Sequence, residues 1–352
     1  MELPSALRSA VDAALHGQSP AALSRAAEQL SARYRGEVRD GTLHLAEDLA
    51  ALAYLAVRLP ATFAAIRAAM EFVGERRPDW QPRSLLDLGS GPGTAIWAAE
   101  SRWGPIAEIT AVEASRPIAR LAEQLWNHGG TKTVAGGKEA QAGGRGTESG
   151  ESGPQVGGAR PPGAPVWEAA DLTGGLPNQR PHDLVTLAYV LNELTADQQA
   201  ALIDRLWALT ADTLLIVEPG TPAGWRRMLS ARDRLIEGGA HLIAPCPHAA
   251  ACPLAAPDWC HFSRRVARTR VHQLVKDVEL AWEDEKYLYL AVTRSPLPAD
   301  ARARILIPPR QGSGRVLLKL CTPSGRVEER LVTKREGEIF KRARRADWGD
   351  AI

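Results

Sequence analysis

The sequence predicts an α/β protein in which a parallel β-sheet carries helices on both faces. Four short apolar segments alternate with segments of helical pattern, and they lie within residues 83–93, 107–115, 182–194 and 212–220. The first of them runs directly into a glycine-rich turn, "GSGPG". Strands that alternate with helices are typical of a parallel sheet covered on both sides. The 352 residues are enough for one large domain or two smaller ones.

Residues 1–80 are predicted to form an N-terminal helical region. Apolar residues recur at four-residue steps from Leu3 to Leu15, as they do on the buried face of a helix. The Ser-Pro pair at residues 19–20 is a typical helix start, because a capping side chain precedes a proline in the first turn. Pro60 is expected to interrupt the helical pattern that continues beyond it.

The remaining chain is predicted to divide into a sheet domain, residues 81–285, and a C-terminal β extension with a basic tail, residues 286–352. Residues 129–165 are predicted to be a disordered insertion, because they are almost all Gly, Ala, Ser, Pro and charged residues. Such a segment has too little apolar surface to offset the entropy of ordering. One more strand is expected in "VWEAADL", and a cysteine-rich loop at residues 244–262.

The positive charge of the chain is concentrated near its C-terminus. Residues 301–345 hold thirteen Lys or Arg against four Asp or Glu, which is a balance of +9. The whole chain has 43 against 41, so the rest of the chain is acidic on balance. This concentration favours a surface that binds the phosphates of folded RNA.

No apolar run approaches twenty residues, so no transmembrane helix is expected. The first residues, "MELPSALRSAVDAALHGQ", lack the basic region and the apolar core of a secretory signal. The prediction is a cytoplasmic protein that does not bind membranes. In that compartment clustered cysteines indicate metal ligands or catalysts before they indicate disulfides.

The glycine-rich turn predicts a nucleotide-type binding site. Asp87, Gly89, Gly91 and Gly93 follow D-x-G-x-G-x-G spacing, after a strand and before a helix. Glycines let the backbone approach a ligand, and the helix start presents free N–H groups. Glu113 ends the next strand, where a carboxylate can accept both hydroxyls of a ribose.

This spacing resembles motif I of the class I S-adenosylmethionine-dependent methyltransferases, which implies a Rossmann-like sheet over about residues 82–220. The resemblance implies that the glycine loop holds the amino-acid part of S-adenosylmethionine and that Glu113 holds the ribose. It also implies that Asp171 meets the adenine. Asn192 and Glu193 fall at motif IV and are the candidates for catalysis, although they could instead cap the next helix or line the pocket.

The cysteines form the second candidate site. Cys246, Cys252 and Cys260 follow C-x5-C-x7-C spacing in a proline-rich loop, and Cys321 is the fourth cysteine of the chain. These gaps differ from the paired knuckles of structural zinc sites. Four thiolates suit an iron–sulfur centre. A Cys3His zinc site with His248 or His261, or four buried free thiols, are the alternatives.

The cysteine loop behind such a core resembles the methyltransferase-like family of small-ribosomal-subunit assembly factors, known from mitochondria and with bacterial relatives. The resemblance runs from about residue 40 to the end and includes "PPRQGSGRVLLKLC". It implies a [4Fe–4S] cluster on Cys246, Cys252, Cys260 and Cys321, and the small ribosomal subunit or its RNA as the partner of a monomeric protein.

Three functions are compatible with these features. The first is methylation of ribosomal RNA with S-adenosylmethionine. The second is RNA binding in ribosome assembly by a protein that keeps the methyltransferase fold without methyl transfer. The third is a small-molecule methyltransferase with a structural zinc loop, against which the basic tail argues.

Overall fold

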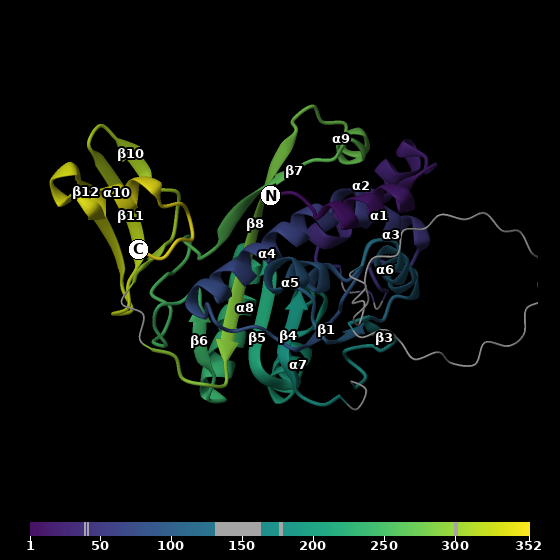
Figure 1. Cartoon of the computed structure of the whole chain (residues 1–352), viewed down its shortest axis with the longest axis horizontal. Coiled ribbons are helices and arrows are strands. Elements are labelled where there is room, and N and C mark those ends of the chain that lie inside the picture. The colour runs from purple at the N-terminus through teal and green to yellow at the C-terminus, as the bar shows by residue number, and fades with distance from the viewer. Residues whose placement is uncertain (39, 41, 131–162, 176–178, 299–301) are drawn as a thin grey trace, which may run out of the picture.

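The computed structural model describes residues 1–352 except 39, 41, 131–162, 176–178 and 299–301. Its central sheet has the strand order β3-β2-β1-β4-β5-β8-β6 (Figure 1). The parallel strands are β1 (Ser84–Leu88), β2 (Glu108–Val112), β3 (Val166–Glu168), β4 (His182–Ala188) and β5 (Thr210–Pro219). The parallel α/β sheet and the strand in "VWEAADL" are therefore confirmed.

One long strand reverses the direction of the sheet. β8 (Trp282–Thr293) runs antiparallel to β5 and to β6 (His241–Ala244). β7 (Phe262–Ala267) pairs with the first half of β8 and continues the line of β6 along the same edge. The predicted border at residue 286 falls inside β8. Because this strand pairs with the central sheet along its length, the C-terminal unit begins after Thr293.

Two helical layers cover the sheet, and neighbouring strand residues face opposite layers. Leu85 belongs to the apolar cluster on the side of the N-terminal helices, whereas Leu86 belongs to the cluster on the other side. The first layer contains α1 (Ser5–Leu15), α2 (Pro20–Arg35), α3 (Asp48–Val57), α4 (Leu59–Arg76), α5 (Thr94–Trp103) and α6 (Arg116–Gly129). The second contains α7 (Ala196–Ala208) and α8 (Pro222–Glu237), preceded by the 3-10 turn Leu191–Glu193.

The predicted N-terminal helical region is present as α1 to α4. Ser19 caps α2 with its hydroxyl, and Pro20 occupies the first turn. The helical pattern breaks at Arg58, and Pro60 lies in the first turn of α4. Almost every residue of α4 between Leu59 and Gly74 is buried, since this helix packs against α3, α5 and the strands β5 to β8.

The predicted insertion 129–165 lies mostly outside the described residues. Gly129 still belongs to α6, and the chain is described again from residue 163.

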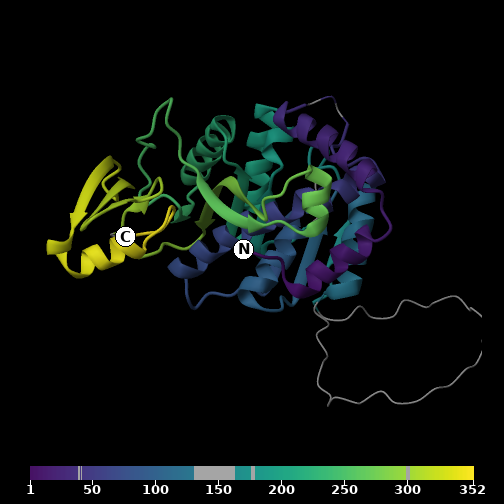
Figure 2. The same ribbon diagram turned by 90° about the horizontal axis from the view of Figure 1, so that it is seen from above.

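The C-terminal unit is a four-stranded antiparallel sheet with one helix, and it stands beside the main body in both views (Figures 1 and 2). It contains β9 (Arg304–Ile305), β10 (Arg310–Gly312), β11 (Arg315–Cys321), β12 (Val327–Thr333), the 3-10 turn Lys334–Glu336 and α10 (Glu338–Arg345). Val316, Leu318 and Leu320 alternate along β11 and pack with Phe340 of α10, so this unit has its own apolar core.

The connection from β7 to β8 folds back over the helical layer. It contains α9 (Arg270–Lys276), which packs against α2 and α3. No single described helix has the length and apolar composition to cross a membrane; α3 and α4 together, bent by 57°, meet that test by length and composition alone.

Candidate functional site

A cavity of about 400 Å³ opens at the carboxyl ends of the parallel strands. Gly89 and Gly91 follow β1, Glu113 follows β2, Asp171 follows β3 and Glu193 follows β4, and all five line it. This is the edge of an open α/β sheet at which ligands bind. Its volume lies in the range of small-molecule sites.

The glycine loop has the backbone that its sequence requires. Gly89, Gly91 and Gly93 have φ angles of +66°, +53° and +76°, in the left-handed region that favours glycine. A Cβ on Gly89 would lie 2.5 Å from Val190, but a Cβ on Gly91 would meet nothing within 4 Å. Gly91 therefore faces open space, whereas Gly93 starts α5 against Trp167 and is not among the residues that line the cavity.

Glu113 links the glycine loop to the next strand. Its Oε2 accepts a hydrogen bond of 2.8 Å from the backbone N–H of Gly91, and its Oε1 accepts one of 2.7 Å from Ser115. Burial raises the pKa of this carboxyl group, and the two N–H donors oppose that rise. A carboxylate has further lone pairs, so these bonds leave acceptor capacity for the hydroxyls of a ligand.

Two other predicted residues lie in and below the cavity. Asp171 lines it, and its Oδ1 accepts hydrogen bonds of 2.8 Å from the backbone and the hydroxyl of Thr173. Asp87 is buried under the glycine loop, where the hydroxyl of Thr186 donates to it at 2.6 Å. Burial raises the pKa of Asp87 to about 7. Asp87 therefore joins β1 to β4 beneath the loop.

The two residues at motif IV, Asn192 and Glu193, have different surroundings. Asn192 is buried and is not among the residues that line the cavity, while Glu193 lines it. Burial raises the pKa of Glu193 to about 8, and the neighbouring carboxyl groups of Glu113 and Glu218 add to the rise. Glu193 can therefore hold or release a proton near neutral pH.

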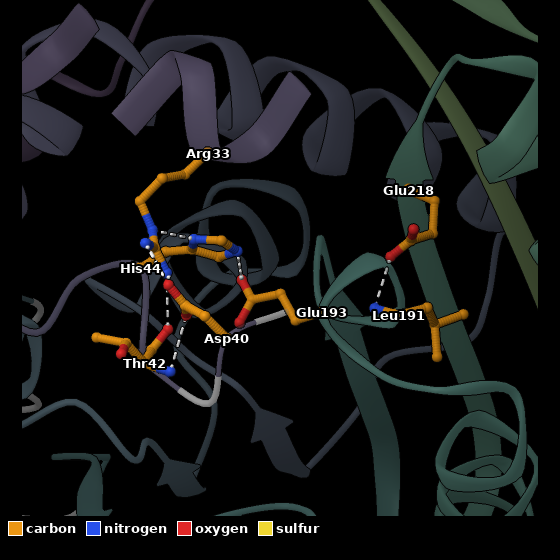
Figure 3. Close-up of polar contacts among 7 residues, drawn as sticks. All are labelled: Arg33, Asp40, Thr42, His44, Leu191, Glu193 and Glu218. Atoms are coloured by element: carbon orange, nitrogen blue, oxygen red, sulfur yellow. Dashed lines mark hydrogen bonds and ion pairs between the residues drawn. The ribbon is translucent and has the colours of Figure 1, made fainter. Parts of the chain in front are cut away.

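The N-terminal region adds a histidine to this cavity (Figure 3). Arg33 donates from Nε to Nδ1 of His44 at 3.1 Å, and its two NH groups bind Asp40 at 2.9 and 2.8 Å. Because Nδ1 of His44 accepts, the ring carries its proton on Nε2, which lies 3.9 Å from Oε1 of Glu193 (Figure 3). Burial, with the Arg33 charge, lowers the pKa of His44.

A second contact fixes the turn that carries Glu193. Glu218 at the end of β5 is fully buried and accepts a hydrogen bond of 3.0 Å from the backbone N–H of Leu191 (Figure 3). Arg227 lies 3.4 Å from Glu218 and 2.9 Å from Glu37 in the N-terminal region. Burial raises the pKa of Glu218 to about 7, and Arg227 opposes this.

The four cysteines line one pocket between the central sheet and the C-terminal unit. Cys246, Cys252 and Cys260 come from the loop between β6 and β7, and Cys321 is the last residue of β11. All four are free thiols. Burial raises the pKa of Cys246 and Cys260, and that of Cys321 to about 12. The donor set suits a tetrathiolate centre, although no group of three or more such ligands converges for a metal ion within the described residues.

The two predicted alternative ligands differ in position. Nε2 of His248 lies 3.4 Å from Sγ of Cys321, and His248 lines the same pocket. His261 is not among the lining residues and packs between Trp259 and Trp348.

A family model described as "Mitochondrial small ribosomal subunit Rsm22" matches residues 48–352. The chain belongs to the Rsm22 family. The match includes the glycine loop, Glu113, all four cysteines and the C-terminal unit, whereas His44 lies before it, and the predicted family is confirmed.

Two relatives match this Rsm22-family chain over different shares of its length. The human protein "Ribosome assembly protein METTL17, mitochondrial" is 29% identical over 354 residues, which are 94% of this chain and 69% of the human protein. The "Rsm22-cox11 tandem protein 2, mitochondrial" of Schizosaccharomyces pombe is 23% identical over 48% of this chain and 29% of its own length.

Solved methyltransferase structures are more distantly similar. Magnesium protoporphyrin IX methyltransferase from Synechocystis PCC 6803 is 13% identical with a TM-score of 0.38, over 75% of this chain and 94% of its own. The ribosomal protein L11 methylase of Lactobacillus delbrueckii subsp. bulgaricus is 13% identical with a TM-score of 0.34, over 64% and 77%.

The arginines that follow the cysteine loop differ from the basic tail. Arg264 pairs with Glu71 at 3.2 Å, Arg265 with Asp284 at 3.0 Å, and Arg268 with Glu283 at 3.1 Å. These charges are therefore neutralised within the Rsm22-family fold. The exposed basic residues of the described C-terminal unit are Arg310, Arg315, Arg326, Arg330, Lys334, Arg335, Lys341, Arg342, Arg344 and Arg345.

Proposed function

We propose that this chain binds S-adenosylmethionine and acts as an assembly factor of the small ribosomal subunit. The charge of the cavity is the observation that carries the cofactor proposal. Three carboxyl groups line it, those of Glu113, Asp171 and Glu193, and the described lining residues include no lysine or arginine. Such a cavity favours a cationic ligand, and the sulfonium and ammonium groups of S-adenosylmethionine are cationic.

The role in assembly is supported by the family and by the names of the relatives. The human relative is named a ribosome assembly protein, and the family model is named for the mitochondrial small ribosomal subunit. The exposed face of α10 supports RNA as the partner, because it presents Lys341, Arg342, Arg344 and Arg345 to solvent. A cytoplasmic, monomeric protein remains the prediction for this chain, whereas the named relatives are mitochondrial.

The proposed metal is a [4Fe–4S] cluster on Cys246, Cys252, Cys260 and Cys321, with zinc as the alternative. When bound, such a cluster supplies a rigid cross-link and a one-electron redox centre. The support is that one pocket collects every cysteine of the chain. His248 is the stronger candidate for a fourth zinc ligand, because it lies beside Cys321.

Methyl transfer is a second candidate function, and Glu193 favours it. A carboxyl group with a pKa near 8 in the cofactor cavity can accept the proton that leaves a methylated nitrogen or oxygen. His44, oriented by Arg33, presents its Nε2–H toward Glu193 at 3.9 Å, on the side from which it would stabilise the ionised carboxylate.

Two measurements test these proposals. Calorimetry with S-adenosylmethionine should give saturable binding that Glu113→Gln weakens at least tenfold, while Glu108→Gln, on the exposed start of β2, leaves it unchanged. Crosslinking of the chain to RNA, followed by mass spectrometry of the bound RNA with and without the protein, separates the two roles. Enrichment of small-subunit RNA without a modification difference supports assembly alone, and enrichment of other RNA contradicts the proposal.

A further inference from the structure

Two buried arginines face the cysteine pocket. Arg232 of α8 is 2% exposed and Arg304 of β9 is 5% exposed, and both line this pocket beside the four thiols. Arginine is rarely buried this completely unless a partner carries the opposite charge, because moving a charge out of water is costly. The question is therefore which negatively charged group balances Arg232 and Arg304.

The polar contacts of Arg232 are chiefly with the cysteine loop itself. Its NH2 donates to the carbonyls of His248 and Ala250 at 2.9 and 2.7 Å, and its Nε has no hydrogen-bond partner. Within the described part of the chain, its ion pair is with Asp233 at 2.9 Å, and the side chain of Asp233 is 61% exposed. An exposed carboxylate is screened by water and compensates a buried charge poorly.

Arg304 is also held by hydrogen bonds to backbone carbonyls. It donates to the carbonyl of Pro245 at 2.9 Å and to that of Gly349 at 2.6 Å, and its guanidinium lies 5.1 Å from the ring of Phe72. No carboxylate lies within ion-pair distance of Arg304 among the described residues. Glu75 is near enough to sense its charge, but burial already raises the pKa of that carboxyl.

No carboxylate of the pocket balances these two charges. The described residues that line it include the four cysteines and the two arginines but no aspartate or glutamate. Four thiolates around Zn²⁺, or around an oxidised [4Fe–4S] core, instead carry a net charge of about −2. Two guanidinium groups match that charge.

We infer that Arg232 and Arg304 compensate the negative charge of a metal–thiolate centre in this pocket. This inference rests on the proposed metal function and extends it to residues that are not ligands. Both arginines also donate hydrogen bonds to carbonyls of the cysteine loop. They therefore position the loop in addition to compensating the charge of the centre.

Compensation has two consequences. The metal should leave more easily when either positive charge is removed, because the loaded state loses its counter-charge. If the metal is an iron–sulfur cluster, its reduced form carries one more negative charge than its oxidised form. Removing an arginine should then disfavour reduction and move the midpoint potential to a more negative value.

The test uses the full chain, purified without oxygen, with variants that remove or keep the charge. Arg232→Met and Arg304→Met remove it, and Arg232→Lys and Arg304→Lys keep it. Arg294→Met is the matched control, because Arg294 also donates to two carbonyls and lies 3.8 Å from an aromatic ring, that of Trp207, but does not line the cysteine pocket. The readouts are the rate of metal release to a chelator and, where iron is present, the midpoint potential in a dithionite titration.

We expect both Met variants to release metal about tenfold faster than the unmodified chain, and the Lys variants and Arg294→Met to release it at nearly the original rate. With iron, the reduced-to-oxidised ratio at the original midpoint should fall about tenfold, which is about 59 mV for a one-electron couple. If the unmodified chain holds a metal but the Met variants match it in both readouts, the charge inference is wrong and the metal proposal stands. If the unmodified chain holds no metal, both are wrong.

Discussion

Glu193 shows how a half-buried acid can be placed in a cavity without a fixed positive partner. It lies near Glu113 and Glu218, and its nearest basic group is the imidazole of His44 at 3.9 Å. Burial lowers the pKa of His44, so this imidazole supplies little positive charge at neutral pH. The cavity is therefore organised to hold Glu193 neutral until a cation or a proton acceptor changes the balance.

The raised pKa of Glu193 predicts a pH-dependent stability of the ligand-free protein. Its folded-state pKa of about 8 lies above the unfolded value for glutamate, roughly 4.3. The native state then retains a proton that the unfolded state releases, so this contribution is present below about pH 4 and is lost as the pH rises to about 8. Glu193→Gln should thus gain roughly 3 kcal/mol relative to the unmodified chain between pH 5 and pH 8.

Urea denaturation at both pH values measures this difference. Glu123→Gln, on the exposed face of α6, is the control and should show no such change between the two pH values. An equal effect of Glu193→Gln at pH 5 and pH 8 would show that the carboxyl group is ionised throughout.

Gly91 allows a direct test of the cofactor loop. Gly91→Val should abolish S-adenosylmethionine binding, because the side chain would enter the open space that the loop presents. The fold should survive, since no protein atom lies within 4 Å of the new Cβ, although a positive φ costs roughly 1–2 kcal/mol for a side chain. Gly17→Val is the control, because Gly17 has a φ of +76° and equally open surroundings far from the cavity. Unchanged affinity in calorimetry would refute the assignment.

The sequence predicted the cavity residues that directly follow strands. It did not predict the residues that the N-terminal region adds to the cavity. Gly89, Gly91 and Glu113 could be predicted, because a strand–glycine–helix pattern fixes their positions locally. Arg33 and His44 could not, because they come from a region whose pattern indicated only helical scaffold. The break after α2 was the one local signal: "RYRGEVRDGTLHL" is polar and glycine-containing between two apolar helices.

At the scale of elements, β8 shows why the domain border was hard to predict. Its apolar residues, Tyr287 to Val292, are all buried, a pattern that fits an inner strand of either sheet. Only the pairing with β5 and β6 decides between them, and pairing is a long-range property. Among the strands that the structure describes, the two units share none.

α10 concentrates the exposed positive charge of the C-terminal unit. Phe340 and Ala343 are buried against β11 and β12, which leaves the basic side chains on the outer face. Replacing Arg342, Arg344 and Arg345 by Glu should weaken binding to many RNA sequences alike. It should also flatten the dependence of affinity on salt, because fewer counterions are released on binding.

Filter binding at several salt concentrations measures both effects. The control carries the same three reversals on the helical layer, at the exposed residues Arg8, Arg25 and Arg120. A changed sequence preference with an unchanged salt slope would indicate that α10 reads bases instead of phosphates.

At the scale of the whole molecule, the cysteine loop is where the two units meet. Lys319 of β11 binds Asp258 of the loop, and Gly325 packs against His248. Arg304 donates both to Pro245 of the loop and to Gly349 near the C-terminus. Except for the bond to Gly349, each of these contacts joins the C-terminal unit to residues between β6 and β7, a stretch with no helix or strand of its own.

Loss of the proposed metal should therefore loosen the C-terminal unit and not the central sheet. Three thiols of the proposed centre lie in the loop and the fourth, Cys321, ends β11, so the centre would join the two units covalently. Cys321→Ser in protein purified without oxygen should lose the iron and the brown colour. Hydrogen exchange should accelerate at least tenfold in residues 302–352, which is about 1.4 kcal/mol of local stability, while strands β1 to β5 remain protected. Thr322→Ser, at the neighbouring residue, should keep both metal and protection. If Cys321→Ser keeps a metal instead, the fourth ligand is a histidine, and His248 is the one to replace next, because its Nε2 lies 3.4 Å from the sulfur that was removed.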